Sequence, residues 1–304
     1  MAVINPSQNY RKYLKPEVIS RLASMDLRAR LVVEGFITGL HRSPYHGFSV
    51  EFAEHRQYMP GDEIKHVDWK VYGKTDRYYV KEFEEETNLK AYLLLDASAS
   101  MGYTSGKITK LEYASYLAAA LTHLMLRQRD AVGLVIFDEA MRQYLPPRSV
   151  NSYLYVILRE LERIQSGKKT NVGRTFHELA ERIKRRGLII VLSDLLAEPQ
   201  DVLSGLKHFR HRNHEVIVFQ ILDPMEITFA FDHDAIFKDL ETGEEISTQP
   251  WHIRGDYRQK VQAFIEKYKR DCRENRIDYV LMDTATDFDR ALFEYLVKRK
   301  RIGG

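Results

Sequence analysis

The feature that most constrains this fold is an alternation, from Leu89 to the end of the chain, of short apolar runs with longer amphipathic stretches. Such alternation is typical of α/β domains, in which helices cover both faces of a parallel sheet. The runs are nearly continuous, as strands buried on both faces must be. They span residues 93–95, 132–137, 188–192 and 216–222. The sequence therefore predicts a doubly wound, mostly parallel sheet within residues 89–304.

The first 88 residues have a different pattern. A helical stretch at 16–33 is followed by short polar runs punctuated by glycine, with no second βα repeat. We expect a separate N-terminal module over 1–88 with small β elements. A type II turn is expected at Pro60–Gly61, because proline fixes φ and glycine accepts positive φ. Trp69 and Tyr78 are expected to pack inside this module, since large aromatic side chains usually belong to a core.

A second interruption falls within the α/β part. Residues 224–254 break the alternation and are interpreted as an insertion. Within it, 235–240 and 245–248 are expected to pair as a hairpin through the turn residues between them.

Charge and composition exclude several classes of protein. The 46 Lys and Arg residues face 43 Asp and Glu residues, and the net charge of +3 is too small to indicate nucleic-acid binding. The longest aliphatic run, Leu188 to Leu192, is too short for a membrane span, and the first residues have no apolar signal core. We therefore expect no membrane span and a cytoplasmic location. The single cysteine, Cys272, excludes a disulfide framework, and its charged neighbours predict an exposed thiol.

Polar side chains follow the first predicted strand in the string LLLDASASMG, residues 93–102. Asp96, Ser98 and Ser100 place three oxygens at the carboxyl end of that strand. Ligands bind at this edge in doubly wound sheets. Carboxylate and hydroxyl oxygens are also the ligands that hard cations such as Mg²⁺ prefer. The pattern therefore indicates a site for Mg²⁺ or Mn²⁺.

Two further loops can complete such a site. Thr170 lies on a loop before a predicted helix, and Asp194 comes directly after the strand at 188–192. Two carboxylates would balance a divalent cation, and three hydroxyls would leave room for one external ligand.

The order Asp-x-Ser-x-Ser, then a loop threonine, then a strand-end aspartate resembles the metal-ion-dependent adhesion site of von Willebrand factor A domains. Each position has the residue that the motif requires: Asp96, Ser98, Ser100, Thr170 and Asp194. In that family the hydroxyls coordinate Mg²⁺, the aspartates act largely through water, and an acidic side chain of the partner completes the shell. The resemblance implies a binding site and not a catalyst.

Residues 56–86, RQYMPGDEIKHVDWKVYGKTDRYYVKEFEEE, are similar to the signature of a bacterial family, domain of unknown function fifty-eight, in which it precedes an A-like domain. Members are commonly encoded beside MoxR-type AAA+ ATPases. The resemblance therefore implies a partner of that kind.

Three alternatives stand beside this interpretation. Serine and aspartate after a strand can simply cap a helix. A metal-dependent phosphoester hydrolase could use the same aspartates, although the motif loops contain no Glu or His for proton transfer. Basic runs could bind nucleic acid, but such runs usually mark solvated helix faces. We expect a metal-dependent protein-interaction adaptor, not an enzyme, with no catalytic residues and no nucleic-acid partner.

Overall fold

The computed structural model describes residues 50–59, 67–85, 90–167, 172–240, 243–292 and 294–295. These residues fall into two compact units, one within 50–85 and one within 90–295. Three predicted features lie outside the described residues: the helix at 16–33, the turn at Pro60–Gly61 and the domain boundary between residues 88 and 89.

The smaller unit contains a two-stranded antiparallel sheet and one short helix, which confirms the predicted β elements. Its elements are β1 (Val50–Gln57), α2 (Trp69–Thr75) and β2 (Tyr79–Glu85). Asp68 caps the helix, because its Oδ1 accepts hydrogen bonds from Lys70 N at 2.9 Å and Val71 N at 3.3 Å. Trp69 and Tyr78 are exposed, so the prediction that they form a core is wrong. A seven-residue helix beside two strands has too little surface to enclose them.

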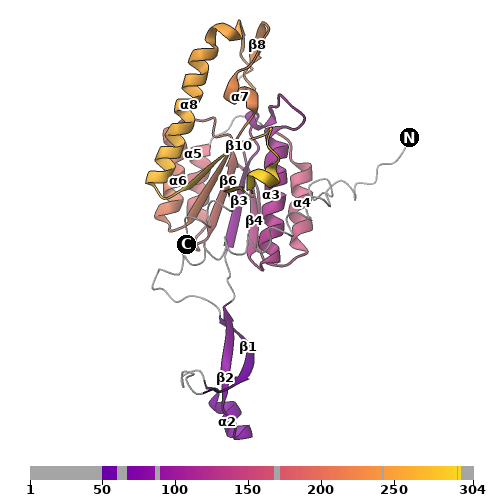
Figure 1. Ribbon diagram of the computed structural model, residues 1–304, viewed down its shortest axis with the longest axis vertical. Helices are drawn as coiled ribbons and strands as arrows, with labels where there is room; N and C mark the ends of the chain where they lie inside the picture. Colours follow the sequence, from indigo (N-terminus) through magenta and orange to yellow (C-terminus); the bar gives the residue numbers. More distant parts are fainter. Residues whose placement is uncertain are drawn as a thin grey trace, which may run out of the picture. The chain divides into compact units, whose positions relative to one another are not determined.

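Six strands form one sheet in the larger unit, in the order β10–β7–β6–β3–β4–β5 (Figure 1). All neighbouring pairs are parallel except β4–β5. The doubly wound, mostly parallel sheet and its four predicted central strands are therefore confirmed. The strand order changes direction at β3, so a crevice is expected at the carboxyl ends of β3 and β6. The strands are β3 (Lys90–Asp96), β4 (Ala131–Phe137), β5 (Met141–Arg148), β6 (Leu188–Ser193), β7 (Glu215–Leu222) and β10 (Asp278–Asp283).

The edge strand β5 is absent from the sequence-based expectations. It has no continuous apolar run, because its residues are only half-buried or exposed. It also contains Pro146 and Pro147, which lack the N–H groups that a central strand needs. Such a strand is tolerated only at the edge of a sheet, where β5 lies.

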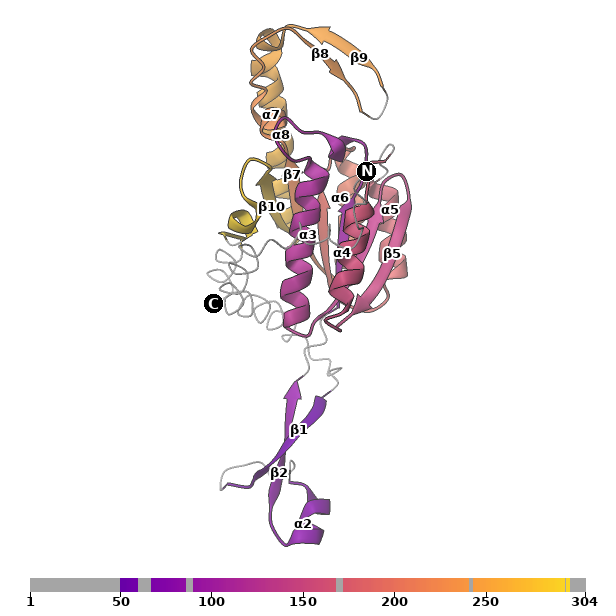
Figure 2. The same ribbon diagram turned by 90° about the vertical axis from the view of Figure 1, so that its right-hand side faces the viewer.

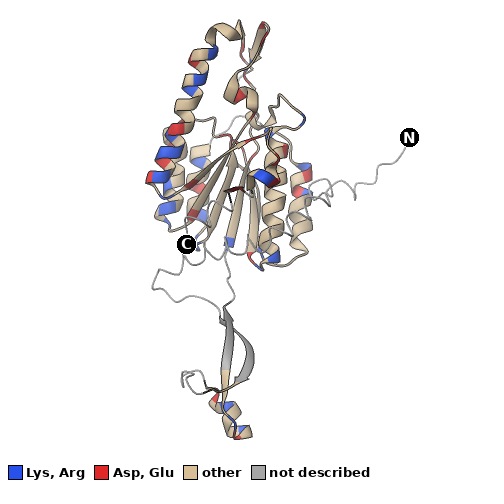
Figure 3. Ribbon diagram, in the orientation of Figure 1, with Lys and Arg blue, Asp and Glu red and all other residues tan. Residues whose placement is uncertain are grey.

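Helices cover both faces of the sheet (Figures 1 and 2). One face packs against α3 and α4, and the other packs against α5, α6 and α8. Charged residues lie mainly on the helices and loops, while the central strands are almost uncharged (Figure 3). The helices are α3 (Lys110–Arg127), α4 (Tyr153–Arg163), α5 (Val172–Arg182), α6 (Pro199–His211), α7 (Pro224–Thr228) and α8 (Pro250–Glu274).

Helix α8 holds the one cysteine of the chain. Cys272 is fully buried beside Tyr268, and burial raises the pKa of its thiol to about 12. The prediction of an exposed thiol is therefore wrong. Ile265, Tyr268 and Cys272 are spaced by three and four residues, so they share the helix face that packs inward, whatever the charge of their neighbours in sequence. Within the described ranges, no helix combines the length and apolar character that crossing a bilayer requires.

The predicted hairpin in the insertion is confirmed as β8 (Ala235–Lys238) and β9 (Glu245–Thr248). Together with α7 and the first turn of α8, it extends beyond the end of the sheet (Figures 1 and 2). We call residues 224–254 the arm.

The pH dependence of stability should include a contribution from His214. This side chain is fully buried; its Nδ1 accepts a hydrogen bond from Gly187 N at 3.2 Å, and its Nε2 lies 3.1 Å from Ile183 O. Burial lowers the pKa of His214. Below about pH 6.5 the unfolded histidine gains a proton while the folded one stays neutral, so stability is lost as the pH falls.

We expect His214→Gln to reduce this loss, because a neutral amide can serve both contacts at any pH. The measurement is urea unfolding of both proteins at about pH 7.5 and about pH 5.5. An equal decrease in unfolding free energy between the two pH values for both proteins would contradict the assignment.

Candidate metal site

Asp96 is the last residue of β3 and is fully buried. Its Oδ1 accepts a hydrogen bond from Ser98 N at 2.9 Å, and its Oδ2 accepts one from Ser193 Oγ at 2.5 Å. Both carboxylate oxygens are thus held by protein groups. In this arrangement Asp96 fixes the loop after β3 and can hold an ion through water rather than by direct contact.

The two motif serines lie side by side after this strand. Ser98 is buried and Ser100 is half-buried at the start of a short 3₁₀ turn. Their Oγ atoms are 3.0 Å apart. Neighbouring ligands of an octahedral Mg²⁺ ion, with bonds of about 2.0 to 2.1 Å, are separated by about 3 Å. The two hydroxyls hydrogen-bond each other at this distance, and the same spacing would fit two positions on one ion.

Asp194 follows β6 and is also fully buried. Its Oδ1 accepts from Leu196 N at 3.1 Å, and its main-chain oxygen accepts from Gln220 Nε2 at 2.9 Å. The next residue, Leu195, has a left-handed φ of 56° although it is buried and not glycine. Such a conformation persists only where the surroundings enforce it. Here Leu195 N donates to Ser193 Oγ at 2.9 Å, and Leu195 O accepts from the Tyr268 hydroxyl at 3.3 Å.

The two aspartates influence each other electrostatically. Burial, and next the negative charge of Asp194, raise the pKa of Asp96 to about 7. Hydrogen bonds from Ser193 and Ser98 act in the opposite direction but do not cancel this effect. The site therefore carries negative charge in a poorly solvated place, which a bound cation would relieve.

Thr170, the remaining motif residue, lies outside the described residues. The chain just before it is held against the loop after β3, because Gly167 N donates to Ala97 O at 2.6 Å. A Cβ atom on Gly102 would lie 2.7 Å from Ser166 Oγ, so the two loops are in close contact. The assignment of Thr170 as a ligand stays a prediction.

A lysine that the sequence does not single out lies at the same place. Lys110, the first residue of α3, is fully buried. Its Nζ donates to Asp194 Oδ2 at 2.8 Å and to Glu226 Oε1 at 2.6 Å. Burial lowers the pKa of Lys110, but the charges of Asp194 and Glu226 outweigh burial, so the pKa is raised and the lysine stays charged. Its neighbours in the sequence do not distinguish it from the solvated lysines elsewhere in the chain.

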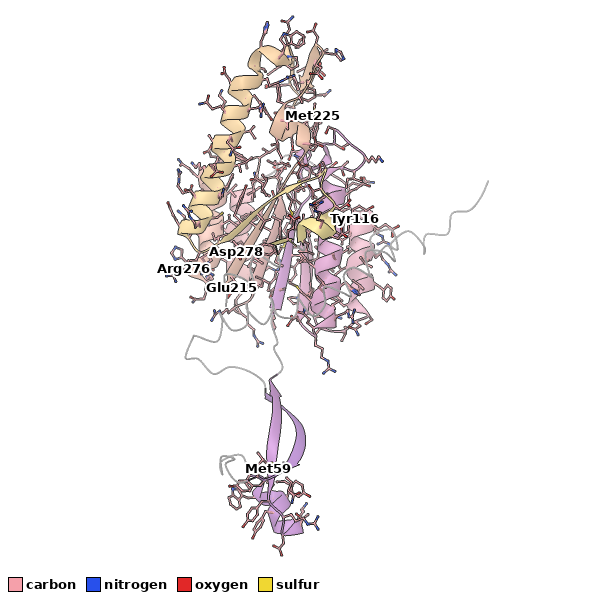
Figure 4. The ribbon with its side chains drawn as sticks, viewed as in Figure 1. Met59, Tyr116, Glu215, Met225, Arg276 and Asp278 are labelled. Atoms are coloured by element: carbon pink, nitrogen blue, oxygen red, sulfur yellow. The ribbon has the colours of Figure 1, made fainter. Side chains whose placement is uncertain are left out.

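Glu226 connects this lysine to the arm. It belongs to α7, and its Oε2 accepts from Asp223 N at 2.9 Å in a capping box. Asp223 in turn accepts from Ser105 Oγ at 2.5 Å and from Ser105 N at 2.8 Å. Figure 4 labels Met225, the neighbour of Glu226, on this helix. The arm is thus joined by hydrogen bonds to the loop that leads into α3.

The donor set fits a hard cation better than a soft one. Hydroxyl and carboxylate oxygens meet here with no sulfur or imidazole ligand among the four placed motif residues, Asp96, Ser98, Ser100 and Asp194. The described residues contain no cluster of three or more His, Cys, Asp or Glu side chains suited to a metal. An ion here would depend on the two serine hydroxyls and on further ligands that these four residues do not supply.

The family model described as "Protein of unknown function DUF58" matches residues 54–266. Two similar chains are "Uncharacterized protein Mb1516" of Mycobacterium bovis and "Uncharacterized protein Rv1480" of Mycobacterium tuberculosis. Each is 25% identical over 306 residues, which cover 99% of this chain and 96% of the relative.

Similar solved structures include conserved hypothetical protein BatB from Bacteroides thetaiotaomicron, with 18% identity and a TM-score of 0.44 over 70% of this chain and 99% of that one. An aerotolerance-related membrane protein from Bacteroides fragilis has 17% identity and a TM-score of 0.46 over the same shares. The SpRpn10 VWA domain has 11% identity and a TM-score of 0.38 over 70% and 95% of the two chains. All three scores are below 0.5, so the fold assignment rests on the strand order described above.

Loss of the buried ammonium should destabilise the protein. In Lys110→Met, the buried carboxylate of Asp194 and the half-buried carboxylate of Glu226 would be left without their cation, and we expect the unfolding free energy to fall by about 3–5 kcal/mol. The measurement is urea unfolding in EDTA, with the exposed Lys107→Met as the matched control. If the two variants lost the same small amount, the buried ion pairs would not contribute to stability.

Proposed function

This chain belongs to the DUF58 family, and we propose that it is a protein-interaction module that binds its partner through a Mg²⁺ or Mn²⁺ ion at the carboxyl ends of β3 and β6. The observation that carries the proposal is the pair of hydroxyls, Ser98 Oγ and Ser100 Oγ, 3.0 Å apart beside two buried aspartates. Ser98, Ser100 and Thr170 would coordinate the ion. Asp96 and Asp194 would act through water and orient the loops.

The charge of the site supports an acidic partner. Lys110 already pairs with Asp194, so the aspartates neutralise less of the charge that a divalent ion would bring. A carboxylate oxygen from a partner would then gain a strong contact in the open coordination position, more than a neutral group would. We infer that the partner supplies an Asp or Glu side chain to the ion.

A hydrolase using the same aspartates is the second candidate, and the geometry disfavours it. The raised pKa of Asp96 is suited to proton transfer near neutral pH. However, its Oδ1 accepts a hydrogen bond from Ser98 N, its Oδ2 accepts one from Ser193 Oγ, and the side chain is fully buried. Proton transfer requires a carboxylate oxygen within reach of the substrate, directly or through one water, and both oxygens of Asp96 are already engaged by the protein.

The family resemblance supports the kind of partner. Because members are commonly encoded beside MoxR-type AAA+ ATPases, we propose that such an ATPase, or a protein on which it acts, donates the acidic side chain. The complex would work in the assembly or maturation of other proteins, in the cytoplasm.

Mg²⁺ binding should depend on the serine hydroxyls. We expect calorimetry to detect one Mg²⁺ site in the full chain and a loss of at least about tenfold in affinity in the Ser98→Ala, Ser100→Ala double variant, because two neutral ligands are removed. Ser152→Ala is the control, since that exposed side chain makes no capping hydrogen bond. Equal affinity in the double variant and the control would show that the ion binds elsewhere.

The same titration tests whether Lys110 opposes the ion. In Lys110→Met the full charge of Asp194 becomes available, so we expect tighter Mg²⁺ binding and a larger stabilisation by Mg²⁺ than in the unaltered protein. Weaker binding in Lys110→Met would mean that the lysine supports the site.

Partner binding should require both the ion and an acidic residue of the partner. We expect a MoxR-type ATPase to bind the immobilised full chain in Mg²⁺ and to be released by EDTA. The Ser98→Ala, Ser100→Ala variant should fail to bind while unfolding at nearly the unaltered temperature, because water can fill the vacant positions. Retention of the ATPase in EDTA, or loss of binding only through unfolding as seen by circular dichroism, would refute the proposal.

A further inference from the structure

A concave surface lies along the arm, and Tyr103 of the loop after β3 also lines it. A cavity of about 340 Å³ lies between α7, the β8–β9 hairpin and the start of α8. Its volume is at the small end of the range found for ligand pockets, about 300–1,000 Å³. We call it the arm pocket. Its walls include Phe229, Phe231, Phe237, Ile246, Ile253 and Tyr257.

Aromatic packing gives the arm pocket a preformed wall. The Phe229 ring stacks on Tyr257, with centroids 4.1 Å apart, and on Phe237, with centroids 5.2 Å apart. Phe231 packs edge-on against Phe237 at 5.1 Å. Interlocked rings have few alternative rotamers, so an incoming apolar group would not need to reorganise this wall.

The mouth of the arm pocket is apolar and solvated. Ile246 and Ile253 line the pocket, yet they are 65% and 39% exposed. Apolar side chains grouped around a cavity and left in water commonly mark an interaction site, because a partner that covers them gains their burial.

The charge of the arm differs from that of the chain. Residues 224–254 contain seven Asp or Glu residues against one Lys and one Arg, whereas the whole chain carries a net charge of +3. A red segment on α7 marks part of this charge in Figure 3. Both arm cations are already engaged: Lys238 lies 3.2 Å from Glu245, and Arg254 donates to Phe229 O and Phe231 O.

We propose that the arm pocket binds a basic segment of a partner protein, with one large apolar side chain in the cavity and flanking Lys or Arg residues against the carboxylates of the arm. The cavity would hold the large apolar side chain of the segment, and the excess of carboxylates on the arm favours positively charged residues on either side of it. An anionic membrane surface would be repelled by the same charge.

This site adjoins the candidate metal site without sharing its ligands. Glu226 lines the arm pocket and accepts from Lys110, which also donates to Asp194. One partner could therefore occupy both places, a basic segment at the arm and an acidic residue at the ion. The inference rests on the proposed function only in taking the ligand to be a protein.

Peptides are selected from a random 12-residue phage library against the full chain in EDTA, so that no divalent ion can occupy the candidate metal site. Two variants probe the arm. Ile246→Ser, Ile253→Ser alters the apolar mouth with little risk to folding, because both side chains are exposed. Asp234→Asn, Glu245→Gln removes two exposed carboxylates. Val150→Ser, Val156→Ser removes equally exposed aliphatic side chains around the start of α4 and is the control.

We expect the selected peptides to contain a large apolar residue flanked by Lys or Arg. Fluorescence anisotropy of the labelled synthetic peptides should show at least about tenfold weaker binding to the isoleucine variant and about threefold weaker binding to the carboxylate variant. Binding to the control should match that of the unaltered protein, with and without Mg²⁺.

Each other outcome overturns the inference. No enrichment, selected peptides that lack basic residues, or equal binding to the isoleucine variant would refute a basic partner segment. A dimer in sedimentation velocity that the isoleucine variant abolishes would mean that a second copy of this chain covers the pocket. Peptides that bind the isoleucine variant as well as the unaltered protein but are lost with Ser98→Ala, Ser100→Ala would place binding at the motif loops and leave the proposed function standing.

Discussion

Two carboxylates buried side by side at the ends of neighbouring parallel strands are the constraint on which the rest of this structure depends. Leu95 of β3 pairs with Leu192 of β6, so the register delivers Asp96 and Asp194 to the same edge. Buried charges are unfavourable unless they are paired and hydrogen-bonded. The surrounding structure supplies these partners through Ser193, main-chain N–H groups and the ammonium of Lys110.

Lys110 joins three elements at one point. It begins α3, pairs with the aspartate after β6 and pairs with Glu226 of α7. The attachment of the arm to the sheet therefore uses the same positive charge that compensates Asp194. A cation that neutralised Asp194 would leave Lys110 paired with Glu226 alone. A change of charge in the motif loops would therefore alter the ion pair that holds α7. Stability at this edge and the proposed binding of an ion there would therefore depend on the same small set of charges.

The sequence indicates the central strands because residues buried on both faces must be apolar, and β3, β4, β6 and β7 meet that requirement. The order of Asp96, Ser98, Ser100 and Asp194 likewise identifies the loops that meet. Lys110 and Cys272 show the limit of such reasoning, because their burial depends on which elements pack against them and not on their neighbours in sequence. The edge strand β5 is missed for a related reason, since a half-exposed strand leaves no apolar run.

The prolines of β5 also restrict how the sheet can associate. A free edge strand can accept a further strand from another chain, and long edges of this kind promote aggregation. Successive N–H groups of a strand point to opposite sides, so of Pro146 and Pro147 one removes a donor from the free edge and the other removes one on the side of β4. Extension of the sheet by another molecule is therefore disfavoured along part of β5.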